Sequence, residues 1–176
     1  MRQLSRVIWI TGLSGAGKTT LAVELVKRLR SEGFQVIFLD GDELREVFGA
    51  ASFNEKNHVR EGRLTLAMQY AHLCRVLAGQ GFTVVIATIS LFREVHQWNR
   101  QNLPGYFEVY LKVPIEELRR RDSKGIYKKF DTGEIQNVAG LDLQVDEPAK
   151  PDLLELFRDK GTILQTVEQI LKKTKG

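Results

Sequence analysis

Short apolar runs recur along the chain and alternate with stretches of helical periodicity. The runs at 6–11, 35–40, 82–88 and 106–113 consist largely of β-branched, aliphatic and aromatic residues, and each has the length of a buried strand. A fifth run, at 152–156, is a weaker strand candidate. Runs that are apolar throughout are typical of strands covered on both faces, as in parallel sheets.

The segments between the runs carry the spacing of amphipathic helices. Leucines recur at helical spacing from Leu21 to Leu29, and Gly33 then favours the end of that helix. Further helices are expected at about 57–80, 115–121 and 162–173. Strands separated by helices indicate a three-layer α/β sandwich with a mostly parallel central sheet of about five strands.

Length and composition fit one globular domain. Of the 176 residues, 43% are hydrophobic and 27% are charged, so we expect residues 1–176 to form a single domain with one substantial core. The segment at about 122–151 is rich in charge and glycine, and a loop of this length is usually functional, so it is predicted to be a lid. Cys74 lies on a helical stripe, which favours a core residue over a nucleophile.

The net charge of +4 suits an anionic ligand. Basic residues are scattered, however, and aromatic residues do not interleave with them as a nucleic-acid platform requires. We therefore expect a small anionic ligand and no nucleic-acid partner. No apolar run approaches the roughly 20 residues of a membrane-spanning helix, and the first residues lack a secretory signal pattern. A cytoplasmic protein without a membrane partner is expected.

The first predicted strand runs directly into a glycine-rich motif. Residues 12–19 read GLSGAGKT, which matches G-x-x-x-x-G-K-[ST] between a predicted strand and a predicted helix. In that context backbone N–H groups surround the phosphates of a nucleoside triphosphate, Lys18 reaches the β- and γ-phosphate oxygens, and Thr19 can bind Mg²⁺. The residues expected at the phosphates are Gly12, Leu13, Ser14, Gly15, Ala16, Gly17, Lys18, Thr19 and Thr20.

Two carboxylates follow the second predicted strand. Asp40 and Asp42 flank Gly41, and ligands of open α/β sheets bind beyond the carboxyl ends of the strands, so both should lie beside the phosphate loop. Asp42 is a candidate to bind Mg²⁺ together with Thr19, or to accept a proton from an attacking hydroxyl. Either aspartate could instead be the N-cap of a helix that begins near Glu43.

Eight short motifs occur in the order and approximate spacing of one enzyme family: GLSGAGKTT, LDGDELR, ISLFR, EVYLKVPIEELRRRD, SKGIYKK, GEI, GLD and EPAKPD. They span nearly the whole chain, which thereby resembles the adenylylsulfate kinases. The resemblance implies a P-loop kinase fold and a cytoplasmic homodimer. It also implies an enzyme that uses ATP and Mg²⁺ to phosphorylate the ribose 3′-hydroxyl of adenosine 5′-phosphosulfate, the second step of sulfate activation.

The resemblance also implies roles for individual residues. Lys18 and Asp42 become the expected catalytic residues, with Asp42 near the 3′-hydroxyl, and Phe53 becomes a ring that clamps the acceptor's base. Ser90 matches a family turn, where serine is more often a turn residue than a phosphate acceptor. Expected lid residues are Arg121, Lys124 and Lys128. Expected acceptor-binding residues are Asp40, Asp42, Arg45, Phe53, His58, Glu61, Ile89, Ser90, Lys124, Val138 and Leu141.

Several acceptor positions depart from the family pattern. His58 replaces a substrate-binding arginine, Glu61 an asparagine, Leu91 the proline of the turn, and Val138 the second base-clamping phenylalanine. Singly, solvation or packing accounts for such changes. Together they suggest a changed acceptor, because the added negative charge and the lost guanidinium both weaken anion binding. Adenosine 5′-phosphosulfate is the first choice, and a cytidine-linked nucleotide such as cytidine diphosphoramidate is the alternative.

Two other protein classes share such a phosphate loop. A GTP-driven switch is disfavoured because the sequence has no Asn-Lys-x-Asp guanine motif. A non-catalytic regulator that only binds ATP would be compatible with the altered acceptor positions, but the intact Asp42 favours an enzyme.

Overall fold

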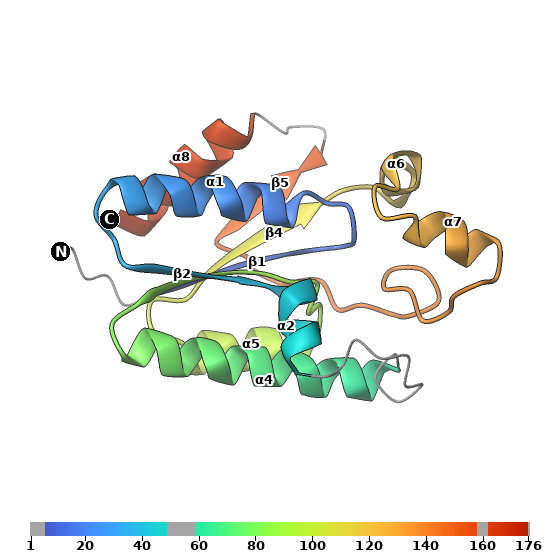
Figure 1. Ribbon diagram of the computed structural model, residues 1–176, viewed down its shortest axis with the longest axis horizontal. Coiled ribbons are helices and arrows are strands. Elements are labelled where there is room, and N and C mark those ends of the chain that lie inside the picture. Colours follow the sequence, from blue (N-terminus) through green and yellow to red (C-terminus); the bar gives the residue numbers. More distant parts are fainter. Residues whose placement is uncertain (1–5, 49–58, 158–161, 176) are drawn as a thin grey trace.

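The computed structural model describes residues 6–48, 59–157 and 162–175, and these ranges contain one five-stranded sheet (Figure 1). The strand order is β2-β3-β1-β4-β5, and every neighbouring pair is parallel, which confirms the prediction. The strands are β1 (Arg6–Gly12), β2 (Val36–Asp40), β3 (Thr83–Ala87), β4 (Phe107–Lys112) and β5 (Leu153–Leu156).

Helices cover both faces of this sheet, so the fold has the three layers expected (Figure 1). One face is covered by α1 (Lys18–Ser31) and α8 (Ile163–Lys175), and the other by α4 (Arg60–Gly79) and α5 (Arg93–Asn102). Three further helices of the described ranges lie at the carboxyl ends of the strands: α2 (Gly41–Val47), α6 (Ile115–Arg121) and α7 (Ile126–Asp131). In the described ranges, no helix combines the length and apolar content that a membrane crossing requires.

Strand β1 supplies side chains to both apolar cores. Ile8 and Ile10 belong to the core under α1 and α8, whereas Val7 and Trp9 belong to the core under α4. Side chains of a strand alternate between its faces, which explains why a strand covered on both sides is apolar at every position. Cys74 is buried in the second core, and this burial raises the pKa of its thiol to about 12, as expected of a core residue and not of a nucleophile.

Two helices lie outside the sequence prediction. Helix α5 buries only Val95 and Asn99, so its sequence lacks the apolar repeat from which helices are predicted. Helix α7 lies inside the predicted lid segment, which is therefore not irregular throughout. The carboxylate of Asp122 accepts hydrogen bonds from the backbone N–H groups of Tyr127 and Lys128 in the first turns of α7, and this local bonding stabilises a helix of six residues.

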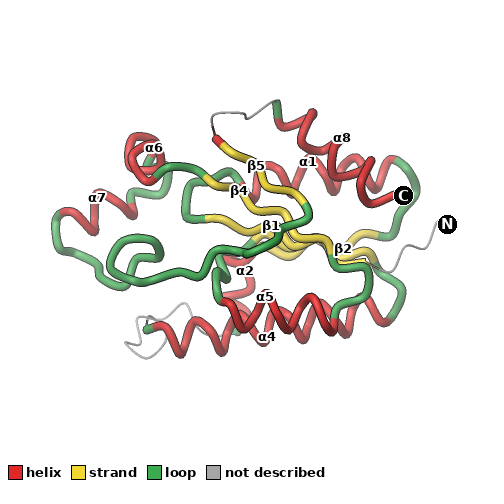
Figure 2. Tube along the Cα trace, turned by 180° about the vertical axis from the view of Figure 1, so that it is seen from behind, coloured by secondary structure: helices red, strands yellow, loops and turns green. Residues whose placement is uncertain are grey.

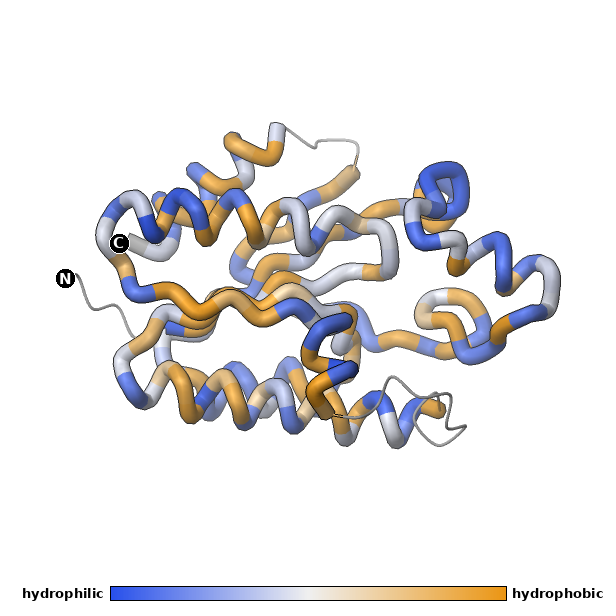
Figure 3. Tube along the Cα trace, in the orientation of Figure 1, coloured by the Kyte–Doolittle hydropathy of each residue, from blue (hydrophilic) through white to orange (hydrophobic). Residues whose placement is uncertain are grey.

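Helix α6, beyond the carboxyl ends of the strands, is rich in charged residues. Figure 3 shows hydrophobic colours along the central strands and hydrophilic colours over α6. After α7 the chain forms a long loop that curls and returns along the sheet to the start of β5 (Figure 2). Helices α6 and α7 and this loop therefore flank the edge of the sheet where the glycine-rich loop and α2 begin.

Candidate active site

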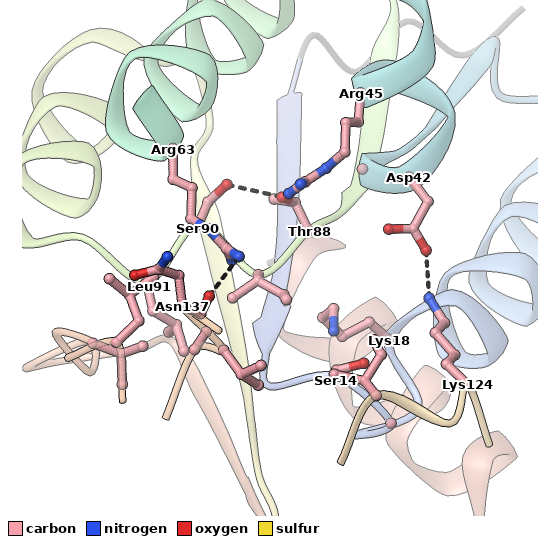
Figure 4. A pocket seen from close by; sticks show the side chains of 18 of the residues that line it. Ser14, Lys18, Asp42, Arg45, Arg63, Thr88, Ser90, Leu91, Lys124 and Asn137 are labelled. Atoms are coloured by element: carbon pink, nitrogen blue, oxygen red, sulfur yellow. Dashed lines mark hydrogen bonds and ion pairs between the residues drawn. The ribbon is translucent and has the colours of Figure 1, made fainter. Parts of the chain in front are cut away.

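A cavity of about 1220 Å³ opens at this edge of the sheet (Figure 4). Its walls come from the glycine-rich loop, the first turns of α2 and α4, the residues after β3, and the segment between α6 and β5. Most pockets for one small ligand measure roughly 300–1,000 Å³. The larger volume suits two ligands bound next to each other.

The glycine-rich loop is shaped by glycines at both of its ends. Helix α1 begins after Gly17, whose φ of 94° is a left-handed conformation that glycine adopts without strain. At Gly12, a Cβ atom would lie 2.7 Å from the carbonyl oxygen of Leu111 on β4, so no side chain fits there. Among the described residues, no side chain caps α1. The N–H groups of its first turn can therefore bind an anion.

Lys18 lies in this loop as a partly buried cation. Its Nζ atom donates a hydrogen bond to the Leu13 carbonyl oxygen at 2.8 Å. Burial, followed by the nearby charge of Lys124, lowers the pKa of Lys18 to about 8, although Asp42 and Asp40 act in the opposite direction. The negative charge of a triphosphate would remove this imbalance, so Lys18 is a strong phosphate-binding candidate.

Asp40 combines two roles that the sequence left as alternatives. Its Oδ1 atom accepts a hydrogen bond from the backbone N–H of Asp42 at 2.9 Å and so caps α2. Its Oδ2 atom accepts from the hydroxyl of Thr19 at 2.8 Å. Mg²⁺ typically binds one or two protein oxygens together with phosphate and water oxygens. The Thr19 and Asp40 oxygens fit such an ion, whereas the sequence predicts Thr19 and Asp42 as its ligands.

Asp42 is paired with a different group. Its carboxylate accepts a hydrogen bond from the Lys124 ammonium, which comes from the segment between α6 and α7 (Figure 4). Partial burial would raise the pKa of Asp42, but the hydrogen bond and charge of Lys124 and the charges of Lys18 and Arg45 outweigh it and hold this pKa below its ordinary value. Asp42 is therefore ionised at neutral pH.

The segment between α6 and β5 is docked on the glycine-rich loop. The hydroxyl of the buried Tyr127 on α7 donates a hydrogen bond to the Ser14 carbonyl oxygen at 2.8 Å. A Cβ atom at Gly140 would lie 2.8 Å from Leu13, so the two segments approach closely. The predicted lid thus covers the loop in this structure, and its opening and closing stay a prediction.

Two guanidinium groups lie at the other end of the cavity. Arg45 extends from α2 and Arg63 from α4, and Arg63 donates a hydrogen bond to the Asn137 carbonyl oxygen at 2.7 Å (Figure 4). Burial and then the charge of Arg45 lower the pKa of Arg63 to about 10, with Asp142 opposing them. Two cations held close together in a partly buried wall favour an anionic ligand at this end.

Ser90 lies in the wall after β3. Its φ of 33° is unusual for a residue other than glycine, and its hydroxyl forms a hydrogen bond with that of Thr88 at 2.8 Å. Both side chains are buried. This geometry fits the turn residue that serine usually is in such a position.

Most residues predicted for the site line one cavity. They are Ser14, Gly15, Gly17, Lys18, Thr19, Thr20, Asp40, Asp42, Arg45, Ile89, Ser90, Arg121, Lys124 and Val138. Gly12, Leu13 and Ala16 belong to the glycine-rich loop but do not line the cavity. Leu91, noted for its departure from the family's turn, also lines the wall.

Three described residues predicted outside the glycine-rich loop also do not line the cavity. Glu61 is exposed in the first turn of α4, Lys128 is exposed on α7, and Leu141 packs against the core under α1. Phe53 and His58 lie outside the described residues. Any role of these five side chains in binding stays a prediction.

Arg63 and Tyr70 also line the cavity, although no motif of the sequence predicted a role in binding for either residue. Arg63, Leu66 and Tyr70 follow one another at helical spacing, and the last two are buried. An arginine that continues a buried stripe is the signal that could have identified Arg63, because arginine is rarely buried without a partner. The Tyr70 hydroxyl donates to the Gly41 carbonyl oxygen at 3.3 Å and so connects α4 to α2.

Phosphoryl transfer is the chemistry that this arrangement supports, because it needs positioned charge and no covalent nucleophile. The loop at the start of α1 and Lys18 suit the phosphates, and Asp42 lies across from them with a partly exposed carboxylate. The protein is thus a nucleotide-binding phosphotransferase of the P-loop class. More narrowly, residues 4–155 match the family model for adenylylsulphate kinase, and the chain belongs to that family.

The chain is similar to kinases named for two different acceptors. It is 38% identical to the cytidine diphosphoramidate kinase of Campylobacter jejuni over 173 residues, which cover 98% of each chain. It is also 38% identical to a probable adenylyl-sulfate kinase of Archaeoglobus fulgidus over 152 residues, 86% of this chain and 95% of that one.

Among solved structures, the fold is similar to that of the Mycobacterium tuberculosis APS kinase in complex with AMPPNP and APS. The TM-score is 0.86 and the identity 28%, over 97% of this chain and 98% of that chain. These comparisons confirm the predicted family, the fold class and the kinase activity. The relatives differ in their acceptors.

Proposed function

We propose that this protein transfers the γ-phosphate of ATP to the ribose 3′-hydroxyl of a nucleoside 5′-phosphoanhydride, and that its preferred acceptor is cytidine-linked, as in cytidine diphosphoramidate. The cavity has two unlike ends, and each suits one substrate. ATP occupies the end at the glycine-rich loop, where Lys18 lies. The 5′-anhydride of the acceptor lies at the end where Arg45 and Arg63 supply two positive charges.

In the transfer step, the acceptor's 3′-oxygen forms a bond to the γ-phosphorus while the bond from that phosphorus to the β,γ-bridging oxygen breaks. Asp42 orients the attacking hydroxyl and accepts its proton, and Lys18 stabilises the charge that develops on the leaving group. Mg²⁺, when bound through Thr19 and Asp40, supplies further charge neutralisation at the phosphates.

Lys124 links the lid to this chemistry. In this structure its ammonium group is paired with Asp42. Phosphate oxygens carry more charge than one carboxylate, so Lys124 is expected to move towards them when ATP binds. The loss of this partner would raise the pKa of Asp42 and make it a better proton acceptor. The lid contact would thus delay full activation of the base until the nucleotide is present.

The observation that carries the acceptor assignment is Val138 on the cavity wall. Its backbone N–H donates to the Asp142 carboxylate at 2.7 Å and the neighbouring Asn137 N–H donates at 2.8 Å, which fixes this part of the wall. The resemblance places an aromatic ring at this position, and valine offers no stacking face. A purine loses more stacking area than a pyrimidine does, so the change favours a smaller base.

Adenosine 5′-phosphosulfate is the second candidate acceptor. Arg45 and Arg63 both line the cavity, and their charges suit a phosphosulfate as well as another anhydride. The similarity to an APS kinase structure in complex with APS also supports it.

A kinase assay with both acceptors separates the two candidates. Purified protein, ATP and Mg²⁺ are incubated with cytidine 5′-diphosphoramidate or with adenosine 5′-phosphosulfate, and the 3′-phosphorylated product is measured by mass spectrometry. We expect kcat/KM to favour the cytidine compound by at least about tenfold. A higher value with adenosine 5′-phosphosulfate would assign the ordinary family function instead.

A matched variant tests the physical reason. Val138→Phe restores an aromatic face, alone or together with His58→Arg and Glu61→Asn, and Val138→Leu keeps the site aliphatic as a control. The aromatic variants should raise kcat/KM for adenosine 5′-phosphosulfate about five- to a hundredfold, the range expected of one stacking contact. The three positions could act on one ligand, so their effects need not add. If no aromatic variant improves this substrate, Val138 does not determine the base.

We also infer a homodimer and cytoplasmic residence, both on the resemblance alone. Light scattering during size-exclusion chromatography tests the first, with a monomer as the contradicting result. Cell fractionation tests the second.

A further inference from the structure

A second cluster of polar side chains lies behind the cavity wall. His96 on α5 has its Nδ1 atom 2.8 Å from Oε1 of Glu108 on β4, and its Nε2 atom 3.1 Å from the backbone oxygen of Asp146. The His96 and Glu108 side chains are only 10% and 4% exposed. None of the three lines the cavity. The cluster therefore cannot contact a substrate directly.

The partners of His96 determine its protonation in this geometry. A backbone carbonyl only accepts hydrogen bonds, so Nε2 must carry a proton. Glu108 accepts from the Tyr106 hydroxyl at 2.8 Å and faces the Arg100 guanidinium at 3.4 Å, which are the surroundings of an ionised carboxylate. An ionised Glu108 requires a proton on Nδ1 as well. Both hydrogen bonds thus exist together only when His96 is an imidazolium.

Asp146 is held by contacts from several elements. Its backbone N–H donates to the Leu91 carbonyl oxygen at 2.9 Å, and its carboxylate accepts from the Arg93 N–H at 3.2 Å and from the Arg60 guanidinium at 3.0 Å. His96 completes this set at the backbone oxygen. The three residues before Asp146, 143–145, line the cavity, as does Leu91. The position of Asp146 therefore sets the position of this wall.

We infer that His96, in its doubly protonated form, is a positioning residue for the acceptor side of the cavity: it ties the Asp146 backbone to Glu108 and so holds residues 143–145 in place. The expected effect of His96 on catalysis rests on the proposed function, which places the acceptor against this wall. The expected effect of His96 on the position of residues 143–145 does not depend on the proposed function.

Loss of one proton from His96 breaks this tie. A neutral imidazole presents a lone pair to either the carboxylate or the carbonyl oxygen, and one hydrogen bond becomes a repulsive contact. Charged and titratable side chains in this network are Arg60, Glu94, Arg100, Tyr106, Glu108, Asp146 and Asp152.

A pH series from about 6 to 8.5 tests this tie, provided that the other titratable groups of the network keep their charge state. Burial and then Glu108 hold the pKa of Tyr106 well above its usual range. Burial would raise the pKa of Asp146, but the Arg93 N–H and Arg60 lower it overall. Both groups therefore keep their charge state across this pH range.

Amide hydrogen exchange tests the wall without any substrate. The reporters are the Asp146 amide, bonded to Leu91, and the Leu143 amide, bonded to Val138. Exchange is compared between wild type and His96→Arg at each pH from about 6 to 8.5, which cancels the intrinsic pH dependence. Relative to His96→Arg, whose charge is fixed, wild type should lose at least about tenfold protection over this range.

Two further variants complete the design. In Glu108→Gln, the side-chain amide can donate a hydrogen bond to Nδ1 of a neutral His96, so amide protection of the wall should not depend on pH relative to the fixed-charge reference. This variant keeps the inference testable even if His96→Arg does not fold. His72→Gln alters an exposed histidine that packs on Trp98 and should behave as wild type. Equal pH dependence in wild type and Glu108→Gln, or a neutral His96 ring at pH 6 in ¹⁵N NMR spectra, overturns the inference.

Kinetics then separate this inference from the proposed function. The wild-type KM for the acceptor that is turned over should rise at least about fivefold between pH 6 and 8.5, while the KM for ATP stays flat up to about pH 8. His96→Arg should remove the rise, and His72→Gln should not. If neither nucleotide acceptor is turned over, the proposed acceptor fails, whereas hydrogen exchange still decides the role of His96.

Discussion

Replacing Asp42 with asparagine should separate the catalytic role of this side chain from its structural one. The ion pair with Lys124 is largely exposed, because the two side chains are 72% and 50% accessible. Exposed pairs contribute about 0–1 kcal/mol, so Asp42→Asn should change the free energy of unfolding by less than about 1 kcal/mol. The start of α2 should be unaffected, since its cap is the Asp40 side chain.

The effect on turnover should be far larger. A positioned general base typically contributes about 10²–10⁴-fold, so kcat should fall at least about a hundredfold, equivalent to about 2.7 kcal/mol of transition-state stabilisation. ATP affinity should change little, because the proposed phosphate-binding groups are Lys18 and the first turn of α1. The loss of transition-state stabilisation should thus exceed the loss of unfolding free energy by a wide margin.

The measurement combines urea unfolding with steady-state kinetics for both substrates. Asp40→Asn is the matched control: asparagine caps a helix about as well as aspartate does, so this variant should fold normally and lose less activity than Asp42→Asn. Near-normal kcat in Asp42→Asn would refute the role of Asp42 as a base. A greater loss in Asp40→Asn would mean that the two aspartates have the opposite roles.

Three other predictions concern the phosphate loop and the lid. Lys18→Ala should reduce kcat by about a thousandfold or more, because it removes the cation at the leaving group, and near-normal turnover by a folded variant would contradict the site. Burial lowers the pKa of Lys18 to about 8 and phosphates raise it, so ATP binding above that pH must take up a proton. The affinity for ATP should be constant below pH 8 and fall above it by up to about tenfold per pH unit. Titration calorimetry at about pH 9 in two buffers of different ionisation enthalpy should detect the proton uptake. If no proton is taken up, ATP binding is not coupled to the protonation of Lys18. Tyr127→Phe leaves the Ser14 carbonyl oxygen without its 2.8 Å partner and should cost about 1–3 kcal/mol of stability, so an unchanged melting temperature would contradict this contact.

The sequence predicted the sheet well because its strands are buried on both faces. Each core strand is apolar at nearly every position, and this pattern is visible without knowledge of its neighbours. The strand at 152–156 was a weaker candidate, and it is the edge strand β5, in which Leu154 and Leu156 are exposed. Helix α5 was missed for a related reason: it buries only Val95 and Asn99, so its pattern of apolar residues is faint.

The residues predicted for the phosphate side of the site lie together in one loop, and their roles in binding stay predictions. Its residues are contiguous, and their roles follow from a loop that the backbone itself shapes. The roles of Asp40 and Asp42 could not be separated in this way, because both are aspartates at one strand end. Only the structure shows that Asp40 faces Thr19 while Asp42 faces Lys124.

The sequence by itself therefore determined the strands, the phosphate loop and the family, since each depends on residues that are neighbours along the chain. The tertiary structure decided which distant residues meet: Arg63 with Asn137, Tyr127 with Ser14, and His96 with Asp146. These contacts join residues 50 or more positions apart. Their geometry depends on how helices pack against the sheet, and no local periodicity carries that information.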